Sequence, residues 1–345
     1  MIKATRTQWI KFAVVLALYL IFLVWLRSWL GLVVVPFIFD AYITKKIPWT
    51  WWRKSKNRHV VTVMGWVDAI VFALVAVYFV NLYFFQNYVI PSSSLEKSLL
   101  TGDYLFVSKM SYGPRVPQTP LHMPLAQHTL PFFNCKSYLE HPQWDYKRVK
   151  GLGDVQLNDI VVFNFPAGDT VATGVPNDDV YRLSYGAGKE LAKPVDLASM
   201  SPEQQRVVYD YYYQLGREYL KENPQNFGEI ISRPVDRREN YVKRCVGLPG
   251  QTLEIKDRII YLDGKANKEP DNVQYRYLVK TKRPIPDDLA HELGISKEDM
   301  MMYYTDASVY NMPLTEKAKA GLLARKDIVV SIENTPADDA GGLYP

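Results

Sequence analysis

Two long apolar segments in the first ninety residues place the strongest limit on how this chain can fold. Residues 9–26 are apolar except for Lys11, and residues 60–85 are apolar apart from Asp68, Asn81 and a few small polar residues. A helix needs about 20 apolar residues to cross a bilayer, so each segment is long enough. The 345-residue chain is 48% hydrophobic overall. The apolar residues are concentrated here, and the remainder is expected to form a soluble part.

The first segment allows two interpretations. Arg27 interrupts it, and residues 28–39 are again mostly apolar. The run predicts either one tilted span with a charge inside it or a span followed by an interfacial piece. A cleaved signal peptide is disfavoured, because the run is longer than a usual signal core and no A-x-A-like site follows it. We therefore assign residues 1–44 to a first transmembrane or interfacial segment and residues 60–86 to a second transmembrane helix.

The loop between these segments predicts the orientation in the membrane. Residues 45–59, KKIPWTWWRKSKNRH, carry six Lys or Arg and no acidic residue. Short loops of this kind stay in the cytoplasm. Residues 87–345 are then outside, and the amino terminus is outside too if the first run spans. The net charge of +5 is explained by this topology, so a lipid bilayer is the expected partner and nucleic acid is not.

The outer part is predicted to be mainly β, with a partly helical insertion. Expected strands cover residues 104–108, 241–246, 252–256, 258–262 and 327–332, with a buried strand at 160–163 and a hairpin turn at Asp263 and Gly264. Residues 114–147 are rich in Pro and His and predict a long loop. Residues 167–240 are interpreted as the insertion. Within it, Ser201 and Pro202 start a helix that reaches about Glu222 and packs on the domain; residues 287–293 and 314–324 predict short helices.

A serine cluster follows the second apolar segment. Ser92, Ser93 and Ser94 come directly after Pro91, and they could form a linker or hold a nucleophile close to the bilayer. A serine hydroxyl reacts only if a base takes its proton. The five histidines lie without a partner motif or on the inner side and are interpreted as surface residues: His59, His122, His128, His141 and His291. No metal-ligand spacing appears, so neither a metal nor a cofactor is predicted.

Lysine can also serve as the base. Its ordinary pKa is about 10.4, so a lysine must be desolvated to be uncharged near neutral pH. Lys243 lies in a predicted strand, where alternation puts it on one face with Cys245 and puts Val242 and Arg244 on the other. A strand lysine taken alone usually faces solvent, but the serine cluster favours the catalytic interpretation. Two cysteines, Cys135 and Cys245, are too few for a disulfide framework, and nothing requires them to pair.

Three blocks together resemble bacterial type I signal peptidase, the membrane-anchored Ser/Lys protease family that removes signal peptides. The family's nucleophile motif, P-S-x-S-M-x-x-(S/T)-L-x-x-G-D, is matched by residues 91–103, PSSSLEKSLLTGD. Its G-D-I-V-V-F strand is matched by residues 158–163, and its lysine motif, K-R-x-x-G-L-P-G-D, by residues 243–251. Leu95, Asn158 and Gln251 replace the usual Met, Gly and Asp. The anchor with its inner basic loop is also similar.

The resemblance implies a function and a set of site residues. Ser94 would be the nucleophile and Lys243 the general base. The Ser92 hydroxyl and the backbone N–H of Ser94 would form the oxyanion hole. The implied protein is a multi-pass serine endopeptidase of the bacterial cytoplasmic (inner) membrane, with its catalytic domain on the extracytoplasmic side. It would cleave signal peptides from exported preproteins at the membrane surface, without a cofactor, and hold the substrate extended along a strand edge.

One departure keeps a second function open. The family's later block, G-D-N-R-x-x-S-x-D-S-R, is not found before Pro345, and residues 338–342, DDAGG, do not match it. The sequence is therefore interpreted as truncated within the domain of residues 87–345. The alternative is a non-catalytic, membrane-anchored homologue that binds extended peptides or a partner protein.

Overall fold

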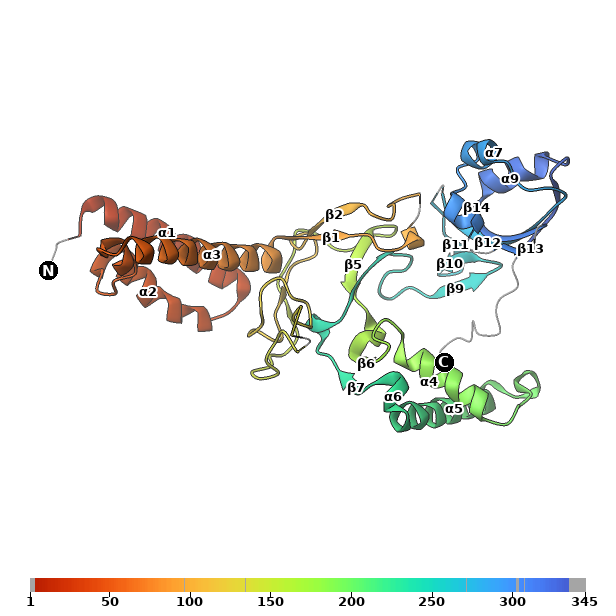
Figure 1. The fold of residues 1–345 in the computed structure, drawn as a ribbon, viewed down its shortest axis with the longest axis horizontal. Coiled ribbons are helices and arrows are strands. Elements are labelled where there is room, and N and C mark those ends of the chain that lie inside the picture. The colour runs from red at the N-terminus through yellow and green to blue at the C-terminus, as the bar shows by residue number, and fades with distance from the viewer. Residues whose placement is uncertain are drawn as a thin grey trace.

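A computed structural model describes residues 4–95, 97–133, 135–270, 272–301, 304–306 and 308–334. An elongated helical part leads into a set of small antiparallel sheets, with a helical hairpin and a compact sheet at the far end (Figure 1). The segments of the helical part are α1 (Arg6–Leu26), η1 (Leu30–Val34), α2 (Val35–Phe39), η2 (Asp40–Thr44), η3 (Trp51–Lys54) and α3 (Arg58–Tyr83). Helices α1 and α3 are the two that are long and apolar enough to cross a membrane.

Local signals in the sequence account for the limits of α1 and α3. Thr5 caps α1 in a reciprocal capping box with Gln8, and Asn57 accepts a hydrogen bond from the His59 amide at the start of α3. Helix α1 ends where Arg27 takes a left-handed conformation with φ +50°. The charge that interrupts the first apolar run is therefore the end of a helix.

The chain between Leu30 and Thr44 runs back along α1 instead of continuing it. The Tyr19 hydroxyl donates to the Gly31 carbonyl at 2.7 Å, and the Phe12 and Phe39 rings lie 5.4 Å apart. At the other end, Phe22 of α1 packs on Tyr83 of α3 at 5.3 Å, so α1 and α3 point the same way. The amino terminus and the basic loop thus lie at the same end (Figure 1). The sequence analysis did not predict this returning segment.

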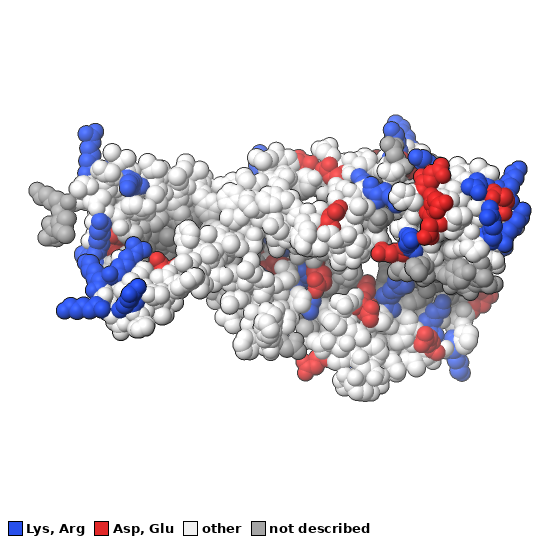
Figure 2. Space-filling model, turned by 45° about the horizontal axis from the view of Figure 1, so that its top comes forward, with Lys and Arg blue, Asp and Glu red and all other residues white. Residues whose placement is uncertain are grey.

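Charged side chains are distributed unevenly along the molecule. On the face drawn in Figure 2, Lys and Arg gather at the end of the helical part that lies away from the sheets, and a band with few charges follows. At that end, Asp40 accepts hydrogen bonds from the amides of Lys46 and Ile47 and from the Trp49 indole. Trp52 is buried, whereas Trp49 and Trp51 are exposed. The basic loop is therefore a folded element with its own carboxylate cap.

The strands pair antiparallel in six small sheets of the described residues. The two-stranded sheets are β1 (Phe85–Val89) with β2 (Tyr104–Ser108), β3 (Arg115–Val116) with β4 (Lys147–Arg148), β5 (Ile160–Asn164) with β8 (Asn240–Arg244), and β6 (Thr170–Ala172) with β7 (Ile230–Ser232). The larger sheets have the orders β11 (Lys265–Ala266), β10 (Ile259–Leu262), β9 (Leu253–Lys256) and β13 (Tyr304–Asp306), β14 (Val309–Thr315), β12 (Gln274–Thr281), β15 (Val329–Asn334). Short 3₁₀ helices are η4 (Ser93–Leu95), η5 (Pro166–Asp169), η6 (Leu197–Ser199) and η7 (Val235–Arg237).

Most of the predicted strands are present within one or two residues of their expected bounds. Asp263 and Gly264 form the expected hairpin turn between β10 and β11, both with positive φ. The strand predicted at residues 160–163 is present as β5, but the expectation that it is buried is wrong, because Ile160 is 38% exposed and Phe163 is 37% exposed. Strand β5 pairs with β8 alone. One face of so narrow a sheet stays open.

The insertion is a helical hairpin on a short two-stranded stalk. Its helices are α4 (Val180–Leu191), α5 (Pro202–Glu222) and α6 (Pro224–Phe227). Ser201 caps α5 as predicted. A Cβ at Gly188 would lie 1.7 Å from the Tyr212 carbonyl oxygen, so α4 and α5 approach too closely for a side chain there. The expectation that this helix packs on the β-domain is wrong, because its buried face contacts α4.

The C-terminal sheet holds the largest apolar core of the described residues. Helices α7 (Asp287–Glu292), α8 (Lys297–Met301) and α9 (Glu316–Ala324) accompany β12–β15. Met312, Leu314 and Leu322 are among its fully buried side chains. The strands β12 and β14 were not predicted. Their alternation was present in the sequence, since Tyr277 and Val279 are buried while Arg276 before them and Lys280 after them are exposed.

Candidate active site

The loop that carries Ser94 is closed at its base by the β1–β2 hairpin. The Ile90 amide donates to the Asp103 carbonyl at 3.0 Å, and the Gly102 amide donates to the Ile90 carbonyl at 2.9 Å. Gly102 has φ +93°, which favours glycine at this turn. The Asp103 carboxylate accepts from the Leu100 amide at 2.7 Å. Asp103 therefore shapes the turn, and Ser94 lies within η4 at the exposed tip of the loop.

Lys243 comes from β8, whose register is fixed on both sides of the lysine. Lys243 pairs with Val161 of β5, and beyond the ladder the Cys245 amide donates to the Asp159 carbonyl at 2.8 Å. The Lys243 ammonium nitrogen Nζ donates to the Ser94 hydroxyl oxygen Oγ at 2.5 Å. The two residues are 149 positions apart in the chain. Two sequence blocks that were singled out separately thus meet at one hydroxyl.

The expectation that Lys243 is buried is wrong. Lys243 and Ser94 are both exposed, because the β5–β8 sheet has only two strands and Lys243 stands on its open face with Tyr241. Val242 and Arg244 point to the covered face, as alternation predicted. The pair is therefore accessible to a large substrate.

Arg244 connects the lysine strand to the serine loop. Its guanidinium donates to the Ser98 hydroxyl at 2.8 Å through one nitrogen and to the Asn158 carbonyl at 2.9 Å through the other. Arg244 thus bridges all three blocks that carry the resemblance. Since Lys243 directly precedes Arg244, these hydrogen bonds keep β8 close to the loop that carries Ser94.

Two departures from the family pattern have a local explanation. Asn158 stands where the family has Gly, and its φ is +69°, a conformation that Asn tolerates better than most residues. Gln251 stands where the family has Asp, and its side-chain oxygen accepts from the Leu248 amide at 2.8 Å. Both replacements preserve the turns in which they lie.

Tyr112 is a site neighbour whose partner was not predicted. Its hydroxyl donates to the Asp159 carboxylate at 2.6 Å, and this hydrogen bond together with burial raises the pKa of Tyr112 to about 12. The same bond lowers the pKa of Asp159. Asp159 therefore stays ionised and joins Tyr112 to the start of the block at residues 158–163.

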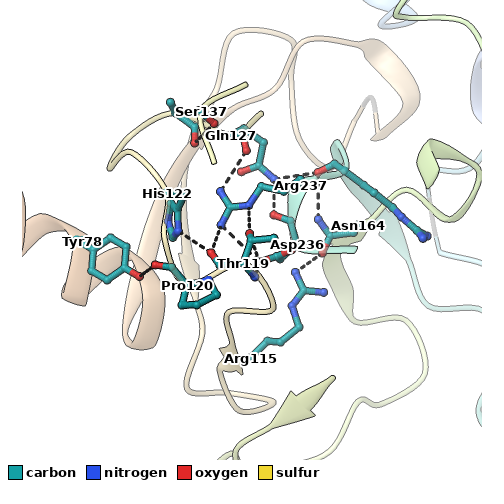
Figure 3. Close-up of polar contacts among 12 residues, drawn as sticks. Tyr78, Arg115, Thr119, Pro120, His122, Gln127, Ser137, Asn164, Asp236 and Arg237 are labelled. Carbon is teal, nitrogen blue, oxygen red and sulfur yellow. Dashed lines mark hydrogen bonds and ion pairs between the residues drawn. The ribbon is translucent and has the colours of Figure 1, made fainter. Parts of the chain in front are cut away.

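A buried polar network lies behind the β5–β8 sheet (Figure 3). The Arg237 guanidinium is almost fully buried and donates to the Thr119 hydroxyl at 2.7 Å, and the Asp236 carboxylate accepts from the Thr119 amide and hydroxyl at 2.9 Å. Asn164 of β5 donates to the Arg238 carbonyl at 3.1 Å and accepts from Arg115. The network ties the long loop after β3 to the strand that pairs with β8.

Two histidines belong to these polar contacts, so their interpretation as surface residues is wrong. His122 is half-buried beside the Tyr78 ring, 5.0 Å away, and contacts the Thr119 carbonyl through Nδ1. His128 is half-buried and lies 2.9 Å from the Glu239 carboxylate. The loop at residues 114–147 contains no period, so nothing local indicated which of its side chains turn inward. His59, His141 and His291 are exposed.

No group of three or more His, Cys, Asp or Glu side chains that could hold a metal ion occurs among the residues the structure describes. Cys135 is exposed, Cys245 is half-buried, and both are free thiols. Residues 338–342, considered above for the late block, lie outside the described residues.

These features define a chain with two long apolar helices and with a serine and a lysine brought together on small antiparallel sheets. The family described as "Signal peptidase, peptidase S26" matches residues 63–299, more than half of the chain. The chain belongs to this family.

Individual relatives match over shorter stretches. Signal peptidase I of Helicobacter pylori is 42% identical over 56 residues, which is 16% of this chain and 18% of the relative. Signal peptidase I P of Bacillus subtilis subsp. natto is 27% identical over 103 residues, 29% of this chain and 52% of the relative. Signal peptidase I of Rickettsia prowazekii is 25% identical over 165 residues, 44% of this chain and 56% of the relative. Each match covers less than two thirds of the relative's own length. No solved structure matches this chain.

Proposed function

We propose that this protein is a serine endopeptidase that removes signal peptides from exported preproteins, with Ser94 as nucleophile and Lys243 as general base. The observation that carries the proposal is the 2.5 Å hydrogen bond between Lys243 Nζ and Ser94 Oγ. A nucleophile and its base must lie within hydrogen-bond reach, and here a loop and a strand that are far apart in the chain supply them. Membership of the signal peptidase family supports the class of substrate.

The reaction reverses the direction of this hydrogen bond. An uncharged Lys243 amine accepts the Ser94 proton while Oγ attacks the scissile carbonyl carbon. The ammonium then gives that proton to the departing amine nitrogen, which leaves an ester on Ser94. Water hydrolyses the ester, with Lys243 again taking a proton. The Ser92 hydroxyl and the Ser94 amide are the proposed donors to the oxyanion, because η4 turns the chain tightly at this point.

The substrate is proposed to bind as an extended strand. Sheets β1–β2 and β5–β8 have two strands each, so each leaves strand edges on which a peptide backbone could pair. Signal-peptide cleavage sites carry small residues at alternate positions, which suits side chains that point into the surface from such a strand. A peptide on this face would also cover the exposed Lys243 and Ser94. Loss of water around the amine favours its uncharged form.

The proposed location in the cell is based on the helical part of the molecule. Helices α1 and α3 are proposed to cross the cytoplasmic membrane of a bacterium, with the basic loop inside and the residues after α3 outside. The segment Leu30–Thr44 is about 22 Å long at the rise of an α-helix, short for a full crossing, so it is proposed to lie within the bilayer beside α1. The domain of residues 87–345 would then meet substrates on the outer side.

The test compares the detergent-solubilised chain with Ser94→Ala and Lys243→Arg on a precursor that carries a cleavable signal peptide. Arginine keeps the charge but cannot act as a base, so both variants should lose at least about 10³-fold in cleavage rate. Ser92→Ala should lose about 10²-fold. Ser93→Ala, which changes the exposed serine between them, is the matched control and should cleave normally.

Two results would overturn the proposal. Cleavage by Ser94→Ala at the normal rate would remove Ser94 as nucleophile, and cleavage by Lys243→Arg would remove Lys243 as base. No cleavage by any form, combined with retention of the precursor on the immobilised chain, would establish the non-catalytic peptide-binding alternative.

A further inference from the structure

A cleft of about 750 Å³ lies where the helical part meets the outer domain. The C-terminal end of α1 forms one wall, and residues 147–154 form the other. Leu26 of α1, Tyr83 of α3 and Val149 pack together as a small buried cluster beside it. The cleft is therefore at the level of the outer ends of the two proposed spans.

Two hydrogen bonds hold the walls together. The Trp25 indole N–H donates to the Lys150 carbonyl at 3.3 Å, and Lys147 Nζ donates to the Arg27 carbonyl at 2.7 Å. The second bond satisfies a carbonyl at the end of α1. Tyr112, which donates to Asp159, also lines the cleft. Ser94 and Lys243 are not part of its lining.

The lining combines four cations with apolar side chains. Its charged residues are Arg27, Lys147, Arg148, Lys150 and Asp154. Among the described residues, none of the four cations forms an ion pair with a carboxylate within 4.0 Å. Val24 and Leu152 in the lining are 67% and 83% exposed. Two of these cations already have hydrogen-bond partners, because Lys147 donates to the Arg27 carbonyl and Arg148 donates to the Gly113 carbonyl and the Tyr146 hydroxyl. No hydrogen bond of the described residues uses the side chain of Arg27 or Lys150. These two cations, which line the cleft beside exposed apolar side chains, fit a ligand with an anionic head and a hydrocarbon body.

We propose that this cleft binds the phosphodiester headgroup of an anionic glycerophospholipid of the outer leaflet, of the phosphatidylglycerol class. Trp25 is a residue type that concentrates at the headgroup level of membranes. Lys and Arg concentrate in the cytoplasmic loops of membrane proteins, so they are not expected at the outer ends of spans. A cluster of them at that place indicates a binding partner. The basic end of a signal peptide does not fit, because these cations would repel it. The proposal rests on the membrane crossing proposed above, and not on peptidase activity.

The test measures lipid retention by native mass spectrometry on the full chain in a non-ionic detergent. Phosphatidylglycerol and phosphatidylcholine are added separately, and inorganic phosphate is added as a competitor. The test variant is Arg27→Gln/Lys150→Gln, since no hydrogen bond of the described residues uses either side chain. The control, Lys189→Gln/Lys193→Gln, removes the same charge from exposed positions at the end of α4.

The wild type and the control should retain phosphatidylglycerol over phosphatidylcholine. The test variant should bind it roughly 30-fold more weakly, because each cation near a lipid surface contributes about fivefold. Equal retention of both lipids, or equal binding by the test variant and the control, would overturn the site. Displacement of the lipid by an equal concentration of inorganic phosphate would make it a phosphate site and overturn the lipid assignment. Extraction of the chain from membranes by carbonate would contradict the crossing, and cleavage assays report on the peptidase separately.

Discussion

The region around Ser94 and the C-terminal sheet are built on different principles. Around Ser94, two-stranded sheets leave the nucleophile and Lys243 exposed, and polar contacts join segments far apart in the chain. The C-terminal sheet β12–β15 instead surrounds the largest apolar cluster of the described residues. The geometry of the proposed site therefore depends on hydrogen bonds and a buried ion pair more than on apolar burial.

The structural reason lies in what a peptide-cleaving surface must leave open. A strand edge and a hydroxyl that receive a long substrate cannot be covered by a core. Their positions must then be set from behind, by Arg244, by the Tyr112–Asp159 bond and by the network around Arg237. The C-terminal sheet has no such requirement on its inner face.

The largest expected effect comes from breaking the buried ion pair. In Arg237→Met, the Asp236 carboxylate loses its nearest cation while its side chain stays 7% exposed. An uncompensated buried charge costs about 3–5 kcal/mol. Thermal unfolding in detergent should show this loss, and cleavage should fall with it because β5 and β8 are released. Arg217→Met, at an exposed position of α5, is the control and should change neither. A stable and fully active Arg237→Met would show that the network does not support the site.

The second prediction concerns the apolar core of the C-terminal sheet. Met312 is fully buried in the C-terminal sheet, and Met312→Ala should destabilise that sheet by about 3 kcal/mol. Hydrogen exchange of the β12 and β14 amides should accelerate by about 10²-fold. The amides of Ile90 and Gly102 at the base of the Ser94 loop should exchange as before, and cleavage should be unchanged. Faster exchange at both places would mean that the two regions unfold as one unit.

The smallest expected effect concerns Lys109, which follows β2. Burial, together with the positive charges of Arg115 and Arg148, lowers the pKa of Lys109 to about 8. An unfolded lysine titrates near 10.4, so between these values the unfolded chain holds more protons, and the free energy of unfolding rises with pH. Lys109→Met should remove that rise and stabilise the chain at pH 7 by on the order of 2 kcal/mol.

Denaturant unfolding at pH 7 and pH 9 measures this effect, with Lys265→Met at an exposed position as the control. A wild-type free energy of unfolding that falls from pH 7 to pH 9 would contradict the lowered pKa of Lys109.

Lys109 is not an alternative base for Ser94. It follows β2 at the α3 end, and the five residues of that strand place it about 17 Å from the loop.

Local signals predicted much of the fold, and non-local arrangements were missed. Strand β2, the start of α5 at Ser201 and the turn at Asp263 depend on neighbouring residues, and each was found. The return of Leu30–Thr44 along α1 depends on contacts such as Phe12 with Phe39, so the apolar run alone did not reveal it. The burial of His122 and the exposure of Lys243 likewise depend on what packs against them.

Four features could be recognised from the sequence alone, because each is a property of adjacent residues. They are the lengths of the apolar segments, the basic loop, the turn residues and the three blocks of the family. The sequence also determined which serine and which lysine to compare. The tertiary structure was needed to show that Lys243 Nζ and Ser94 Oγ lie 2.5 Å apart, that both residues are exposed and that α1 and α3 run parallel. Such facts arise from chain segments that are distant in sequence, and their packing follows from the whole set of contacts rather than from any one pattern.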